Sequence, residues 1–187
     1  MRIDSSGNVG IGTSSPSAPL TILSTGWEFL KLLNTTSNST AKSGNITVGH
    51  YTNTEESFGI LSGQSTASSN ILSIGGGRGG LNAATSIEFF AAANNTTTTG
   101  TEAMRIDSSG NLLVGKTSPT ISTTGVELRP NGQVFATQSG NYPLLLNRTT
   151  SDGDIIQLRK DGTTVGSIGT PFTGELYIAA SGANSSG

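Results

Sequence analysis

Several residue types on which protein chemistry often depends are missing or scarce in this chain. None of the 187 residues is cysteine, which excludes disulfides, thiolate nucleophiles and cysteine-based zinc or iron–sulfur sites. Only 12% of the residues are charged and the net charge is -2, so the chain lacks the basic surface that neutralises nucleic-acid phosphates. No apolar run approaches the roughly 20 residues that a membrane-spanning helix needs. We therefore expect neither nucleic-acid binding nor membrane insertion.

The chain is instead rich in residues that form turns. Glycine, serine, threonine and asparagine make up about half of it, whereas the hydrophobic residues amount to 33%. Low hydrophobicity leads to disorder chiefly when the net charge is high, and here the net charge is small. This composition favours a regular, polar architecture with many turns.

An internal repeat organises the sequence. The octapeptide Met1–Asn8 (MRIDSSGN) recurs without change as Met104–Asn111. The repeat predicts two modules, one over residues 1–103 and a shorter one over residues 104–187, with an insertion in the second near residues 126–135. We expect the chain to be a piece of a longer protein or the product of processing.

The local patterns predict an all-β fold. Turn residues separate apolar runs of a few residues each, and no window shows a convincing helical period. Pairs of Asn-Gly and Asp-Gly within Pro130–Gln133 and Lys160–Thr163 are typical of tight hairpin turns, and Asp107–Asn111 and Ser151–Asp154 are also predicted as turns. The fold expected is a meander of short strands or β-helix-like modules. In the first module the strands are predicted at Arg2–Asp4, Val9–Ile11, Leu20–Leu23, Phe29–Leu33, Asn45–Tyr51, Phe58–Leu61, Ile71–Ile74 and Ile87–Phe90.

Short strands of this kind bury little apolar area in one chain, which at about 25 cal/mol per Å² gives a marginal core. Oligomerisation would supply the missing burial and would protect the strand edges. Three chains around one axis satisfy both requirements. Within the strands, Arg2 with Asp4, and Arg105 with Asp107, are candidates for ion pairs between neighbouring chains.

Two segments resemble one protein family. Met1–Thr13 (MRIDSSGNVGIGT) resembles a segment common in tail-fibre and other virion fibre proteins of bacteriophages, often those that end in an intramolecular chaperone related to that of endosialidase. Leu144–Gly166 is similar to a second segment of that family. Nothing in the sequence resembles the chaperone itself.

The resemblance implies an elongated, intertwined homotrimeric β-fibre, exposed as an extracellular appendage on the surface of a virion. The partners implied are copies of the same chain, other virion proteins, and a host-surface glycan or protein as receptor. The expected function is structural, contributing to host attachment without catalysis, and no catalytic, cofactor-binding or metal-binding residue is predicted. Two alternatives stay open: a tailspike-like polysaccharide depolymerase, and a non-viral extracellular filament or adhesin built from the same module.

Glycan hydrolysis needs two carboxyl groups roughly 5–9 Å apart. The candidates are the pair Glu55 and Glu56, the pair Asp152 and Asp154, and Asp161. The aspartates stand beside glycine in turn-forming strings, and the glutamates read as solvated loop charges. We therefore interpret all five as structural.

The remaining motifs have similarly plain interpretations. The single histidine, His50, would become three on a three-fold axis and could then hold a transition metal, although a half-exposed strand histidine is the simpler interpretation. Gly75–Gly80 (GGGRGG) lacks the Lys-Ser/Thr of a phosphate loop and is predicted as a turn. Asp4–Asn8 lacks the ligands of a calcium loop and is also predicted as a turn. Trp27 is predicted to pack at the fibre axis.

Overall fold

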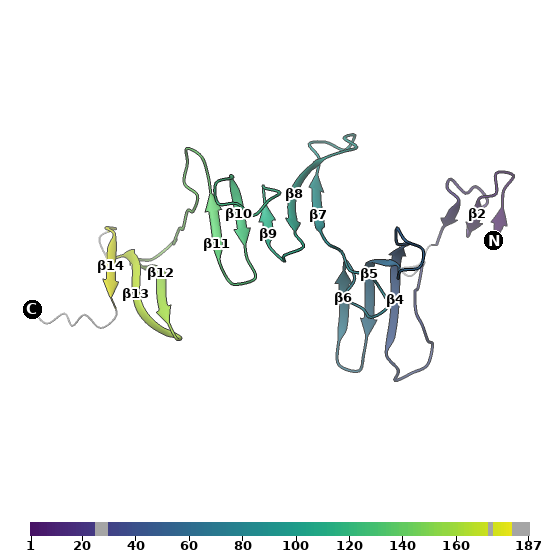
Figure 1. The fold of residues 1–187 in the computed structure, drawn as a ribbon, viewed down its shortest axis with the longest axis horizontal. Helices are drawn as coiled ribbons and strands as arrows, with labels where there is room; N and C mark the ends of the chain where they lie inside the picture. Colours follow the sequence, from purple (N-terminus) through teal and green to yellow (C-terminus); the bar gives the residue numbers. More distant parts are fainter. Residues whose placement is uncertain (25–29, 172–173, 181–187) are drawn as a thin grey trace, which may run out of the picture. The chain divides into compact units, whose positions relative to one another are not determined.

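The computed structural model describes residues 1–24, 30–171 and 174–180. The all-β prediction is confirmed: the described residues form fourteen strands in four small sheets and no helix (Figure 1). The chain divides into two compact units, Met1–Ile87 with Ile106–Ser109, and Glu88–Arg105 with Gly110–Gly187. The predicted module boundary at residues 103/104 falls inside a strand.

The first sheet of unit 1 contains β1 (Arg2–Ile3), β2 (Val9–Ile11) and β3 (Leu20–Ile22). β1 and β2 are antiparallel, and β3 lies parallel to β2. The turn between β1 and β2 is built on Asp4, whose Oδ1 accepts hydrogen bonds from the backbone N–H groups of Ser6 and Asn8, both at 2.9 Å. The turn predicted at this position is confirmed.

The second sheet of unit 1 is an antiparallel meander of β4 (Lys42–Val48), β5 (Phe58–Ser65) and β6 (Asn70–Ile74). The strand predicted over Phe29–Leu33 is wrong for residues 30–33, which form no strand, while residue 29 lies outside the described residues. This segment instead crosses the sheet over Gly44, where an added Cβ would lie 2.4 Å from the carbonyl oxygen of Leu32. Leu32 therefore lies over a sheet rather than extending one.

Unit 2 contains most of a five-stranded sheet with the order β11-β10-β9-β8-β7. β10 (Gly125–Leu128) and β11 (Val134–Thr137) form a hairpin at the place of the insertion predicted near residues 126–135. The loop at residues 92–100 joins β7 to β8, and the turn at residues 107–111 joins β8 to β9. The strands are β7 (Ile87–Ala91), β8 (Thr101–Ile106), β9 (Leu112–Val114), β10 (Gly125–Leu128) and β11 (Val134–Thr137).

The two copies of the repeated octapeptide adopt the same turn but have different neighbours. Asp107 Oδ1 accepts the N–H of Ser109 at 2.9 Å, as Asp4 does that of Ser6, and the glycines that follow have φ angles of 82° at Gly7 and 80° at Gly110. β2 then pairs with a parallel strand, whereas β9 pairs with the antiparallel β10. The inserted hairpin therefore changes the sheet that the second copy joins.

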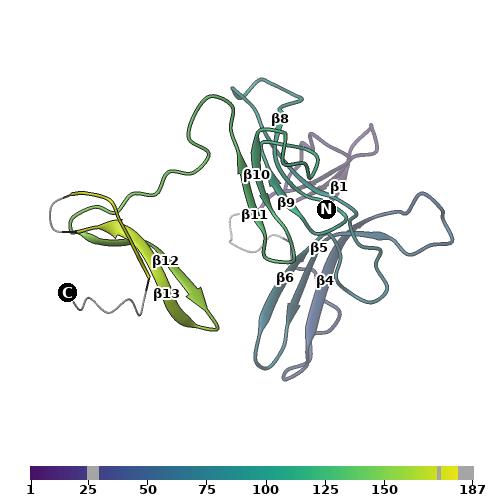
Figure 2. The same cartoon turned by 60° about the vertical axis from the view of Figure 1, so that its left-hand side comes forward.

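The last sheet contains β12 (Gly153–Lys160), β13 (Thr163–Thr170) and β14 (Tyr177–Ala180), all antiparallel. The long β12–β13 hairpin is seen in Figure 2. Its two-residue turn is Asp161-Gly162, with φ angles of 49° and 80°. Two positive φ angles in succession are the geometry of a type I′ turn, so the hairpin predicted from this Asp-Gly pair is confirmed.

Replacing Gly162 by alanine is expected to destabilise the chain by about 1 kcal/mol, because an L-residue is strained at this φ although no atom lies within 4 Å of the added Cβ. A thermal melt of Gly162→Ala measures the change. Gly49→Ala is the matched control, since Gly49 also has no atom within 4 Å of the added Cβ but has no positive φ. Equal melting temperatures for the two variants would contradict the strain argument.

The described residues bury very little apolar surface within one chain. Leu113 is the one large hydrophobic side chain that is fully buried among them, and large apolar side chains on every sheet are exposed. Interiors of soluble domains normally contain several such residues in mutual contact. Taken alone, each sheet lacks a conventional hydrophobic core.

Candidate functional site

The strongest candidate surface is one face of β9, β10 and β11. The pairings Val126 with Val114 and Leu128 with Leu112 place these side chains on the same face, because side chains alternate along each strand. The pairings with β11 add Val134 and Ala136 to this face. We call these six residues the β9–β11 apolar face; four of them, Val114, Val126, Leu128 and Val134, are 37–68% exposed.

The opposite face of the same three strands is closed by the chain itself. It carries Leu113 and Glu127, both fully buried. The loop between β9 and β10 is fixed near this face, since Lys116 Nζ donates to the carbonyl of Thr120 at 2.5 Å and Thr137 Oγ1 donates to that of Ile121 at 2.8 Å. One face of these three strands is therefore buried under a loop of the same chain. The other face is apolar, and the described residues leave it partly exposed.

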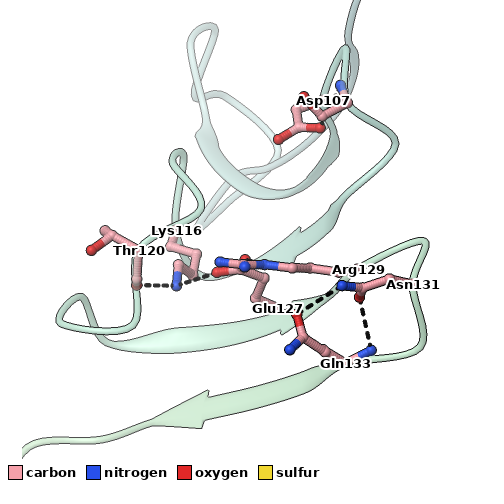
Figure 3. A network of polar contacts seen from close by, with 8 residues as sticks. Asp107, Lys116, Thr120, Glu127, Arg129, Asn131 and Gln133 are labelled. Atoms are coloured by element: carbon pink, nitrogen blue, oxygen red, sulfur yellow. Dashed lines mark hydrogen bonds and ion pairs between the residues drawn. The ribbon is translucent and has the colours of Figure 1, made fainter.

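A buried ion network holds the closed face together (Figure 3). Lys116 Nζ lies 3.1 Å from Glu127 Oε2, and the side chains of both are almost completely buried. Arg129 Nε donates to the other oxygen of Glu127, and its guanidinium carbon lies 4.6 Å from the ring centre of Phe135. Burial alone would raise the pKa of Glu127, but hydrogen bonds from Arg129 and Lys116 outweigh it and lower that pKa. Glu127 is thus held as a carboxylate between two cations.

Acid is expected to destabilise the folded chain. Hydrogen bonds from Arg105 lower the pKa of Glu102 in the folded state, and the pKa of Glu127 is lowered as described above. Since both folded values lie below the ordinary 4.5, these groups stabilise the fold above that pH, and the stabilisation is lost as the pH falls through the folded values. Melting curves should change little from about pH 8 to 5 and shift to lower temperature below about pH 4.5. A melting temperature that rises on acidification would contradict this.

A second apolar surface lies on the β4–β6 sheet. The pairings of Ile46 with Leu61 and of Leu61 with Ile74 place three half-exposed aliphatic side chains in one row. Beside them is an open groove of about 600 Å³, which Leu32 and Leu72 also line. Leu32 covers the neighbouring Gly44, but the three side chains of the row stay 36–54% exposed.

The structure places the candidate acids at three positions, with Asp152 and Asp154 close to one another at the start of β12. Glu55 and Glu56 are exposed in the turn before β5, and Asp161 is exposed in the β12–β13 turn, with its carboxylate 3.4 Å from Lys160 Nζ. Asp152 accepts a hydrogen bond from Thr170 Oγ1 at 3.3 Å. The structural interpretation made of these acids from the sequence fits their positions.

Asp154 has the most distinctive surroundings of the five. It accepts a hydrogen bond from the hydroxyl of Tyr177, and this bond, with one from Ser167, lowers the pKa of its carboxyl. Asp152, Thr170 and Tyr177 line a neighbouring pocket of about 320 Å³. The arrangement joins β12 to the far strand, β14, because the hydroxyl of Tyr177 reaches Asp154.

The other predicted motifs serve local structure. His50 Nδ1 accepts the backbone N–H of Thr52 at 3.1 Å, and no group of three potential metal ligands occurs among the described residues. Gly75–Gly80 forms the loop after β6, as predicted. Trp27 lies outside the described residues.

The arginine of the second octapeptide has ion-pair partners within its own chain. Arg105 Nε and Nη2 bind the two carboxylate oxygens of Glu102, and Nη2 also lies 3.5 Å from Glu88. The carboxylate of Asp107 accepts the backbone N–H of Ser109 within the turn. Within one chain, Arg105 therefore pairs with acids of β7 and β8, and its ion pair with a neighbouring chain stays a prediction.

Comparisons with known proteins found no match to this chain among family models, curated proteins or solved structures. In the described residues there is no helix with the length and apolarity needed to cross a membrane. The function is therefore argued from the resemblance of two sequence segments and from the exposed apolar faces.

Proposed function

We propose that this chain is a subunit of a homotrimeric β-fibre on the surface of a virion, where it contributes to host attachment without catalysing a reaction. The partners proposed are two further copies of the chain, other virion proteins, and a glycan or protein of the host surface. The resemblance of Met1–Thr13 and Leu144–Gly166 to virion fibre proteins supports both the proposed family and an assembly of three copies.

The observation that carries the proposal is the β9–β11 apolar face. Four of its side chains remain 37–68% exposed in one chain although the reverse face of the same strands is closed by its own loop and ion network. Exposed apolar surface of this kind marks a contact with another protein surface. A second copy fits this surface, because each copy brings the same uncharged, aliphatic face.

The lack of burial in the rest of the described chain supports the same proposal. The β4–β6 sheet also presents a half-exposed aliphatic row, that of Ile46, Leu61 and Ile74. Small sheets with so little internal burial gain most of their stability from association. Closed cyclic symmetry would cover such faces on every copy at once.

Electron microscopy with a gold-labelled antibody against the chain tests its place on a virion. Particles released from cells that carry the gene should be labelled on a fibrous appendage. Label confined to filaments that are not attached to particles would instead support the non-viral filament. Release of reducing sugar from host-surface polysaccharide by the purified chain would support the depolymerase and contradict the non-catalytic role.

A further inference from the structure

The loop Gly75–Gly80 after β6 carries a single arginine, Arg78. The start of the loop is fixed, because a Cβ on Gly76 would lie 2.8 Å from the Cα of Ala83. The end is loosely packed, since a Cβ on Gly79 or on the glycine after it would have no atom within 4 Å. The glycines next to Arg78 at the tip therefore have open space beside them, whereas the base of the loop is closely packed.

The Arg78 side chain lies against the β4–β6 sheet and uses one of its nitrogens there. Nη1 donates to Oε1 of Gln64 at 2.6 Å. Nε and Nη2 are buried and have no hydrogen-bond partner among the described residues. Two of the three guanidinium nitrogens, which carry three of its five N–H donors, thus have no acceptor among the described residues, although buried donors are satisfied in most proteins.

The two unpaired nitrogens share one edge of the guanidinium plane. Their N–H groups point in parallel, in the geometry that binds both oxygens of a carboxylate. The same chain contains this pairing, because Nε and Nη2 of Arg105 bind the two oxygens of Glu102. An edge that is charged, buried and unpaired is costly, and a carboxylate is the group that matches it.

Glu55 and Glu56, the described glutamates that precede β5, do not pair with this edge. Glu56 precedes β5, and its carbonyl accepts a hydrogen bond from Asn82 Nδ2, whereas Gln64, which holds Arg78, lies near the other end of β5. The six residue steps from Phe58 to Gln64 span about 20 Å of strand. The carboxylate must therefore come from outside the described chain.

We propose that the Nε–Nη2 edge of Arg78 is a carboxylate-binding site, opened by movement of the loop tip. The carboxylate is either that of a soluble acidic ligand or that of an acidic side chain on a second copy. The second source rests on the proposed function. Both sources offer a carboxylate, and the two arms of the experiment distinguish between them.

The first arm of the test uses sodium acetate as the probe and sodium chloride at equal ionic strength as the reference. For a soluble carboxylate, about 0.2 M acetate should raise the melting temperature of the full chain by roughly 3 °C more than chloride does. Arg78→Lys, which keeps the charge but not the fork, should abolish this difference. Arg159→Lys is the matched control, because Arg159 is exposed on β12. The ¹⁵Nε resonance of Arg78 should shift with acetate, a readout that does not depend on a variant folding.

The second arm measures assembly. For a carboxylate on a second copy, acetate has no selective effect, and Arg78→Lys weakens assembly about tenfold while Arg159→Lys does not. If Arg78→Lys matches the wild type in both its acetate response and its assembly, and the Arg78 resonance does not move, the proposal is overturned. A monomeric wild type would contradict the proposed assembly, but the acetate arm would still test Arg78.

Discussion

Replacing Val126 and Leu128 together by aspartate is expected to reduce the wild-type assembly to monomers. Both side chains lie on the β9–β11 apolar face, with exposures of 37% and 39% in one chain. Burying each against a neighbour stabilises the assembly by roughly 1 kcal/mol or more, and three-fold symmetry repeats both changes three times. The loss is on the order of 6 kcal/mol per trimer, or about 10⁴-fold in the association constant.

Ile121→Asp is the matched control for this pair. Ile121 is also an exposed aliphatic residue, at 61%, but it lies in the loop between β9 and β10 and not on the apolar face. Its side-chain chemistry is comparable, and its carbonyl bond to Thr137 is unaffected by the substitution. Light scattering measures the mass of all three proteins. If the loop variant dissociates and the double variant does not, the apolar face is not the contact.

Glu127→Gln is expected to lower the melting temperature by an amount on the order of 10 °C. The substitution leaves Lys116 charged and almost fully buried without its counter-ion. It also removes the charge that holds Arg129 over the sheet. Removing one partner of a buried pair is far more damaging than removing both, because the remaining charge has no compensation.

The double variant Lys116→Met with Glu127→Leu tests this reason directly. It removes both buried charges and replaces them with apolar groups of similar size, so it should recover most of the stability lost in Glu127→Gln. Arg129 is 31% exposed in its side chain and can turn to solvent. Circular dichroism melts compare the three proteins. A double variant as unstable as Glu127→Gln would show that the fold needs the ion network itself.

The sequence predicts the turns of this fold better than its sheets. Asp161-Gly162 and Asp4–Asn8 adopt the predicted turns because the preference resides in the residues themselves. The apolar residues 30–33 are predicted as a strand, but they form none, and Leu32 lies over Gly44 of the β4–β6 sheet instead. Local pattern cannot distinguish an apolar residue that extends a sheet from one that covers it.

Only part of the candidate site can be predicted from the sequence. The alternation of Val126 and Leu128 with Glu127 can be read from the sequence, and so can that of Val134 and Ala136. The pairing of Lys116 with Glu127 could not be predicted, because the two residues are 11 apart and meet only through the β9–β10 register. Arg78 looked like a loop residue, and only the geometry shows its unpaired edge.

The solution mass of the purified chain, by light scattering at several concentrations, tests the proposed assembly most directly. A mass near three times 19.0 kDa is predicted, because three copies would cover the apolar faces that one chain leaves exposed. A mass of 19.0 kDa at all concentrations, with an intact β-sheet spectrum, would contradict it.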